Sequence, residues 1–251
     1  MSRKDAKPVK AYRNIDFLTS SEARTVRLLT EYLEPETRFE RYNVEDTIVF
    51  FGSARASGKD DGASARLQRY YDDAEELAYQ MTLWSKSLTG TRHRFIVCSG
   101  GGPGIMEAAN RGASRAKGLS VGLGISLPHE QGVNPYASRE LSFDFHYFFM
   151  RKFWFVYLAR ALVVFPGGYG TFDELFELLT LVQTHKATRP RRIVLYGREF
   201  WEKIINWDML VAWGVIGRED LSLFELCDTT EEAKSFLTRE LGRIHGLDTA
   251  E

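Results

Sequence analysis

The sequence predicts an α/β protein, built as a single domain around a doubly wound, mainly parallel sheet of about seven strands. Seven short apolar runs alternate along the chain with longer segments of helical period, which is the pattern of right-handed βαβ units. The runs are apolar throughout instead of alternating with polar residues, as expected of strands covered on both faces. A length of 251 residues suits one large domain of this class.

The strands are expected in the apolar runs Thr47–Phe51, Phe95–Cys98, Ser120–Ser126, Leu141–Phe145, Leu162–Phe165, Arg192–Tyr196 and Leu223–Cys227. The helices between them are expected at Ser64–Leu88, Gly104–Lys117, His146–Arg160, Thr171–His185 and Phe200–Trp213. An earlier helix, opened by Thr19-x-x-Glu22, should end near Leu33, because Pro35 and a polar stretch follow. Thr229-x-x-Glu232 begins a last helix that runs to about Arg243. Residues 1–46 are thus expected to form a tail and a helix, and residues 47–245 the α/β domain.

Composition excludes several classes of protein. Hydrophobic residues make up 44% of the chain and charged residues 27%, as in an ordinary globular protein. The formal net charge of −1 does not favour binding to a nucleic-acid polymer or an anionic membrane. The most apolar run, Phe153–Ala159, is far shorter than the ~20 residues that span a bilayer, and the basic, polar start of the chain is no signal peptide. Cys98 and Cys227 lack metal-type spacing, and the histidines form no HxH or HExxH pattern, so we expect no metal and a reducing, cytoplasmic location.

A glycine-rich turn follows the strand that ends at Phe165. Pro166 ends this strand, and Gly167, Gly168 and Gly170 allow a sharp turn and the close approach of a ligand. Thr171 can cap the next helix, whose N-terminus offers unpaired N–H groups and a positive dipole end to a phosphate. Glu174 would then lie one turn from this anion cradle. Thr171 and Glu174 also fit a capping box, in which Glu174 only accepts a backbone N–H.

A second glycine loop, Ser99-Gly-Gly-Gly-Pro-Gly104, again lies between a strand and a helix. It predicts a second anion cradle at the same edge of the sheet, with Gly101, Gly102, Gly104 and Met106 near the ligand. Ile105 occupies the place of the third glycine of the dinucleotide fingerprint, and no Gly-Lys-Ser/Thr of a phosphate-binding P-loop follows. The alternative is a tight connection that binds nothing.

The loops after the strands should meet at one edge of the sheet, where open α/β sheets bind ligands. Gly52 and Ser53 follow the first strand and are expected to join the two glycine loops there. Arg151 and Lys152 interrupt an aromatic-rich helix, where burial of a cation is costly unless it meets an anion or reaches solvent. A guanidinium pairs bidentately with phosphate or carboxylate, so Arg151 is expected at the ligand. Lys152 either contacts the phosphate or extends to solvent.

Three pieces together, Ser99-Gly-Gly-Gly-Pro-Gly-Ile-Met-Glu107, Met150-Arg-Lys152 and Pro166-Gly-Gly-Tyr-Gly-Thr-x-x-Glu174, resemble the LOG family. Members of that family are phosphoribohydrolases of cytokinin nucleotides that are sometimes mislabelled lysine decarboxylases. The resemblance implies a Rossmann-like nucleotide-binding catalytic domain, a homodimer or larger homo-oligomer, and no cofactor. It also implies hydrolysis of a nucleoside 5′-monophosphate to free base and ribose 5-phosphate.

The resemblance further implies catalytic roles for Arg151 and Glu174, and phosphate binding by Gly167, Gly168, Gly170 and Thr171. The chain is longer than the compact plant-type members, and it carries Pro-Gly-Ile-Met where those have Val-Gly-Leu-Met. AMP or another purine nucleotide is therefore as plausible a substrate as a cytokinin riboside monophosphate. Glu174 could stabilise a positively charged sugar, activate water or act as nucleophile. The rival functions are a nucleotide sensor without catalysis and a carrier of a phosphorylated pterin, the molybdenum cofactor.

Overall fold

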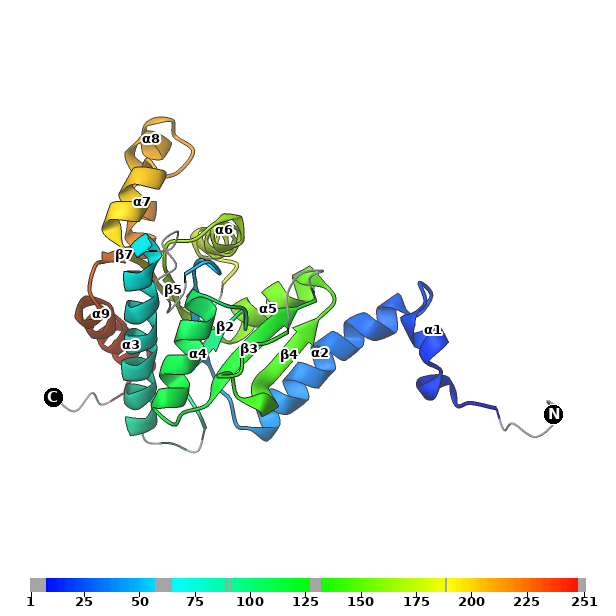
Figure 1. The fold of residues 1–251 in the computed structure, drawn as a ribbon. Helices are drawn as coiled ribbons and strands as arrows, with labels where there is room; N and C mark the ends of the chain where they lie inside the picture. The colour runs from blue at the N-terminus through cyan, green and yellow to red at the C-terminus, as the bar shows by residue number, and fades with distance from the viewer. Residues whose placement is uncertain are drawn as a thin grey trace.

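The seven strands pair into one parallel sheet (Figure 1). The computed structural model describes residues 8–56, 65–88, 90, 92–126, 132–187 and 189–247. The strands are β1 Thr47–Phe51, β2 Ile96–Ser99, β3 Ser120–Ile125, β4 Ser142–Phe145, β5 Ala159–Val164, β6 Arg192–Tyr196 and β7 Phe224–Cys227. Their order is β4-β3-β2-β1-β5-β6-β7, so the direction of winding reverses between β1 and β5. The predicted Rossmann-like, doubly wound fold is confirmed.

Helices cover both faces of the sheet, because successive side chains of a strand point to opposite sides. Ile48 and Phe50 of β1 pack in one core with α3 (Ala65–Ser87), α4 (Ile105–Arg115) and α9 (Thr230–His245). Val49 and Phe51 belong to the other core, which contains residues of α2 (Arg24–Arg41), α5 (Phe148–Leu158), α6 (Tyr169–Gln183) and α7 (Arg198–Ile204). Burial of all five β1 residues explains why this strand reads as a continuous apolar run.

The remaining elements are short. They are α1 Ile15–Thr19, α8 Trp207–Ala212 and the 3₁₀ helices η1 Ala11–Arg13, η2 Arg139–Leu141 and η3 Arg218–Leu223. The N-terminal half of α2 and the whole of α1 extend away from the sheet (Figure 1). Within the described residues, no helix combines the length and apolar character needed to cross a membrane.

The expectation that the first helix ends near Leu33 was wrong, since α2 continues through Pro35 to Arg41. A proline inside a helix leaves the carbonyl four residues earlier without its amide donor. That carbonyl belongs to Glu31, and the indole Nε1 of Trp154 donates to it at 3.0 Å. The Glu31 carboxylate also accepts from the backbone N–H groups of His146 and Tyr147, just before α5. Glu31 of α2 is therefore bonded both to α5 and to the residues that precede it.

Two other element boundaries were wrong. The helix expected to reach Arg160 ends at Leu158, and β5 begins at once with Ala159, which pairs with Thr47 of β1. The helix expected from Phe200 to Trp213 is two helices, because the Asn206 side chain accepts from the Met209 N–H and starts α8 anew.

Candidate active site

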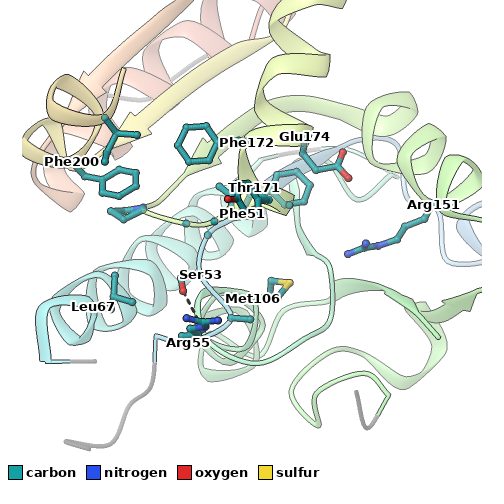
Figure 2. A pocket seen from close by; sticks show the side chains of 18 of the residues that line it. Phe51, Ser53, Arg55, Leu67, Met106, Arg151, Thr171, Phe172, Glu174 and Phe200 are labelled. Carbon is teal, nitrogen blue, oxygen red and sulfur yellow. Dashed lines mark hydrogen bonds between the residues drawn. The ribbon is translucent and has the colours of Figure 1, made fainter. Parts of the chain in front are cut away.

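A cavity lies beyond the carboxyl ends of β1 and β5, where the strand order reverses (Figure 2). It encloses about 1040 Å³ and is lined by the loop after β1, the loop after β5, and side chains of α4, α5, α6 and α7. In open α/β sheets this reversal point is the usual place of ligand binding, because adjacent loops diverge there and leave a crevice.

Three loops are fixed to one another by backbone hydrogen bonds. The Ser53 N–H donates to the Pro166 carbonyl at 2.9 Å, and the Ile105 N–H donates to the Ser53 carbonyl at 3.1 Å. Gly104 has a φ of +70°, and a Cβ atom there would collide with the backbone of Ser53 and Ala54. The loops after β1, β2 and β5 therefore form one rigid unit around the cavity.

Helix α6 begins at Tyr169, before the expected start at Thr171. Its N-cap is Gly168 without a side-chain cap, and the Phe172 N–H donates to the Gly168 carbonyl. The expectations that Thr171 caps the helix and that Thr171 and Glu174 form a capping box were both wrong. Thr171 instead lies in the first turn, and its side chain packs where a Cβ atom on Gly167 would stand. The N–H groups of Tyr169, Gly170 and Thr171 come before the first hydrogen bond of the helix, and all three residues line the cavity.

Glu174 is a buried carboxyl group that lines the same cavity, with 7% of its surface exposed. Burial raises the pKa of Glu174 to about 7; the positive charges of Lys152 and Arg151 oppose this rise, while Glu177 and Asp173 add to it. A carboxyl group with this pKa exchanges its proton near neutral pH, which is common among catalytic acids and bases.

Arg151 extends from α5 into the cavity on the side that Glu174 faces (Figure 2). Its Nε donates to the Leu123 carbonyl at the end of β3, at 2.8 Å. Its guanidinium lies over the ring of Phe155, 5.1 Å from the ring centroid, and a Cβ atom on Gly100 would come 2.6 Å from its Nη2. The Leu123 carbonyl and the glycine loop Ser99–Gly104 thus fix its orientation.

Most of the sequence-predicted site residues meet at this cavity. Those that line it are Gly52, Ser53, Met106, Arg151, Gly167, Gly168, Gly170, Thr171 and Glu174. Gly101, Gly102, Gly104 and Lys152 are not part of this lining. Gly104 serves the packing of two loops, and the Gly101 carbonyl accepts from both the backbone N–H and the side-chain amide of Asn134.

Lys152 contributes to the site from outside the cavity. Its Nζ lies 2.9 Å from Asp173 and 2.6 Å from Glu177, the acidic residues that flank Glu174 in the sequence. Burial lowers the pKa of Lys152, but the hydrogen bonds to Glu177 and Asp173 outweigh burial and raise it. Lys152 therefore ties α5, which carries Arg151, to α6, which carries Glu174.

Sequence reasoning missed several residues of the lining. Tyr169, Phe148, Phe172 and Phe200 bring aromatic rings to the cavity, and Arg55 brings a guanidinium. Tyr169 is 97% exposed, which leaves its ring open to contact with a ligand. The position of Arg55 directly after a strand was the available signal, whereas the aromatic residues resemble ordinary core residues in the sequence. Among the described residues, no three His, Cys, Asp or Glu side chains gather as metal ligands would.

A family model described as "Possible lysine decarboxylase" matches residues 106–237, which is more than half of the chain. The chain belongs to this family, the LOG family. The match includes Arg151, Lys152 and the whole glycine turn from Pro166 to Glu174. The match begins after the glycine loop Ser99–Gly104.

One curated relative is a bifunctional cytokinin biosynthesis protein of Fusarium pseudograminearum, 30% identical over 86 residues. The match covers 34% of this chain and only 17% of that protein. Among solved structures, TM1055 superimposes with a TM-score of 0.51 at 20% identity, over 77% of this chain and 99% of TM1055. A Moco carrier protein from Chlamydomonas reinhardtii reaches a TM-score of 0.45 at 16% identity, over 79% and 99% of the two chains. The likeness to TM1055 supports the fold.

Proposed function

We propose that this protein hydrolyses the N-glycosidic bond of a nucleoside 5′-monophosphate, AMP or a cytokinin riboside 5′-monophosphate, to free base and ribose 5-phosphate. The observation that carries the proposal is Glu174, a carboxyl group at 7% exposure that shares a cavity with a helix N-terminus. Membership of the LOG family and the partial match to a cytokinin biosynthesis protein support it.

The phosphate would bind at the start of α6. The N–H groups of Tyr169, Gly170 and Thr171 and the positive end of the helix dipole suit a phosphate dianion. Glu174 follows Thr171 by three residues, an axial rise of about 4.5 Å in a helix, which is the scale of a ribose ring. A phosphate held by the first turn thus brings the sugar to the carboxyl group.

Glu174 would act on the sugar as the bond to the base breaks. Cleavage builds positive charge on the ribose ring, and water supplies the hydroxyl group of C1′ while the base leaves with a proton. Glu174 can stabilise the charge, take a proton from water or attack C1′. Each of these roles uses the ionised carboxylate. Arg151 favours that form, since its charge lowers the pKa of Glu174, and it orients the carboxylate or the phosphate.

The family description names lysine decarboxylation, but the lysine at this site does not suit that chemistry. A lysine that forms a Schiff base with a cofactor must be able to give up its proton. The ammonium group of Lys152 is held by two carboxylates that raise its pKa. We therefore place Lys152 among the residues that position the site.

A product assay tests the proposal. Purified protein is incubated with AMP, a cytokinin riboside 5′-monophosphate, CMP and adenosine, and free base is measured by chromatography. We expect base release from at least one purine monophosphate and far less from adenosine, which lacks the phosphate. Glu174→Gln keeps the size of the side chain but cannot ionise, and should lower kcat by at least about 100-fold.

The matched control is Glu177→Gln, one turn further along α6. Glu177 pairs with Lys152 outside the cavity, so this variant should retain turnover. Equal turnover by Glu174→Gln and wild type would refute the role of Glu174. Binding of AMP without base release from any substrate would refute hydrolysis and indicate a sensor, and a copurifying phosphorylated pterin would indicate a carrier.

A further inference from the structure

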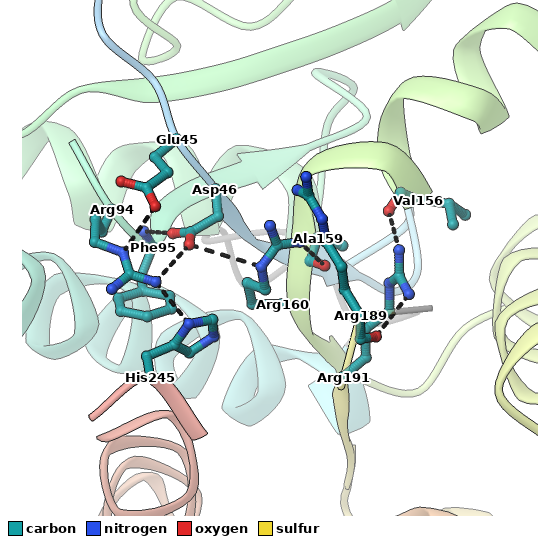
Figure 3. A network of polar contacts seen from close by, with 10 residues as sticks. All are labelled: Glu45, Asp46, Arg94, Phe95, Val156, Ala159, Arg160, Arg189, Arg191 and His245. Carbon is teal, nitrogen blue, oxygen red and sulfur yellow. Dashed lines mark hydrogen bonds and ion pairs between the residues drawn. The ribbon is translucent and has the colours of Figure 1, made fainter. Parts of the chain in front are cut away.

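A second cavity lies at the opposite edge of the sheet from the candidate active site. It encloses about 660 Å³ around the amino ends of β1, β2, β5 and β6, next to the last turns of α2, α5 and α9. Four arginines line it, Arg92, Arg94, Arg160 and Arg189. We call it the arginine pocket. Figure 3 shows the polar contacts behind it.

Arg160 is buried to 5% exposure yet makes little use of its five N–H donors. Its Nη1 donates to the adjacent Ala159 carbonyl at 3.1 Å, and its Nε lies 3.7 Å from Asp46 Oδ2, which is an ion pair but too long for a hydrogen bond. No other group of the described chain accepts a hydrogen bond from Arg160. The remaining donors are therefore available to whatever fills the pocket.

Asp46 cannot balance the charge of Arg160 alone, because it already has two other partners. Its carboxylate accepts from the Phe95 N–H at 2.6 Å and from Arg94 Nη2 at 3.0 Å. Burial lowers the pKa of Arg160; Asp46 opposes this, and the nearby charges of Arg189 and Arg94 lower the pKa further. The buried guanidinium of Arg160 and the partly buried guanidinium of Arg94 thus share one buried carboxylate.

The other charged groups around the pocket have separate partners or lie at its rim. Glu45 lies 3.8 Å from Arg94 Nε, Glu36 accepts from the Tyr32 hydroxyl, and Glu40 is exposed. His245 Nδ1 accepts from Arg94 at 2.8 Å, so this imidazole is neutral.

Arg191 donates to the Val156 and Arg189 carbonyls and does not line the pocket. Arg160, Arg189 and the exposed Arg92 are left as the cations that line the pocket. The exposed ring of Tyr157 lines the same cavity.

We propose that the arginine pocket binds a small organic oxyanion, a phosphate monoester or a carboxylate, through Arg160 and Arg189. Guanidinium groups match the oxygens of both head groups bidentately, and a bound anion would balance the buried charge that Asp46 leaves unmatched. The organic part of the ligand would contact Tyr157. This site is separate from the candidate active site and does not depend on the proposed hydrolysis.

Calorimetric titration of the full chain with phenyl phosphate, benzoate and benzyl alcohol tests the proposal, because these probes share a ring and differ in head group. Wild type should bind phenyl phosphate or benzoate, and the stronger binder identifies the head group. Benzyl alcohol should not bind. Arg189→Ala changes an exposed side chain, and Arg160→Lys keeps the charge paired with Asp46, so both should fold. Each substitution should lower the affinity for the oxyanion by at least about tenfold.

Two controls separate the pocket from other binding. Arg239→Ala removes an exposed arginine of α9 that does not line the pocket, and Arg151→Ala alters the candidate active site. Both should retain the binding that Arg160→Lys and Arg189→Ala lose. Equal affinity of wild type and the pocket variants would overturn the proposal. An equal loss in Arg239→Ala would also overturn it, because binding would then follow net charge alone.

Discussion

The stability of the fold and the proposed activity favour different protonation states of Glu174. The fold favours its neutral form, since burial raises its pKa from 4.5 to about 7, whereas the proposed reaction uses its ionised form. Near neutral pH the protein therefore holds a carboxylate that its own packing disfavours. Strained or destabilised groups of this kind are common in active sites.

The pH dependence of unfolding tests this conflict at the scale of the residue. The pKa of Glu174 is higher in the folded state than in the unfolded state, so its protonated form stabilises the fold. This stabilisation is complete below pH 4.5 and is lost as pH rises through about 7. The full loss is about 3 kcal/mol, at 1.36 kcal/mol per pKa unit. Urea unfolding between pH 4 and pH 8 should show wild type losing this free energy relative to Glu174→Gln, which cannot ionise there. Parallel curves for the two proteins would refute the raised pKa.

At the scale of elements, the site depends on how α5 and α6 are joined. Lys152 pairs with Asp173 and Glu177, and it is 16% exposed. Its charge also lowers the pKa of Glu174. The same lysine thus connects the two helices and favours the ionised form of the reacting group, without lining the cavity.

Lys152→Met should shift the pH dependence of base release. If the ionised carboxylate is the working form, kcat/KM falls below a pH of about 7 in wild type. Loss of Lys152 raises the pKa of Glu174 further, so the fall in kcat/KM should begin at a higher pH. The variant should also lose roughly 1–2 kcal/mol in its free energy of unfolding. Lys203→Met removes an exposed pair with Glu199 on α7 and should leave the profile in place. A merely structural role for Lys152 would lower stability without moving the profile.

One indole donor replaces the amide that Pro35 removes from helix α2. Trp154→Phe removes the hydrogen bond to the Glu31 carbonyl and leaves this partly buried acceptor without its partner, at a cost of about 1 kcal/mol beyond the lost packing. Pro35→Ala restores an amide that can donate to Glu31. We therefore expect Trp154→Phe to cost less in the Pro35→Ala background, as measured by a double-mutant cycle of urea unfolding. Equal costs in both backgrounds would show that packing alone explains the effect of Trp154.

For the whole molecule, the sheet was predictable because its signal is local. Each strand is a short apolar run, and the two glycine loops mark where strands end. The place of the site at one edge follows from parallel strands alone. These features need no knowledge of distant partners.

What could not be predicted depends on contacts between distant residues. The path of α2 through Pro35 requires Trp154, and the position of Arg160 in a strand follows from pairing with β1. Gly104 illustrates a different limit. A glycine signals that some backbone or ligand comes close, and here the group that comes close is the Ser53 backbone. The residue type did not reveal which partner fills the space.

The bond between Trp154 and Glu31 sets an order of events during synthesis of the chain. The two residues are 123 positions apart, so at ribosomal rates Glu31 precedes Trp154 by roughly 6–25 s. For that time the Glu31 carbonyl lacks its indole partner and can accept only from water. Helix α2 therefore gains this hydrogen bond only after the aromatic helix that carries Arg151 has been made.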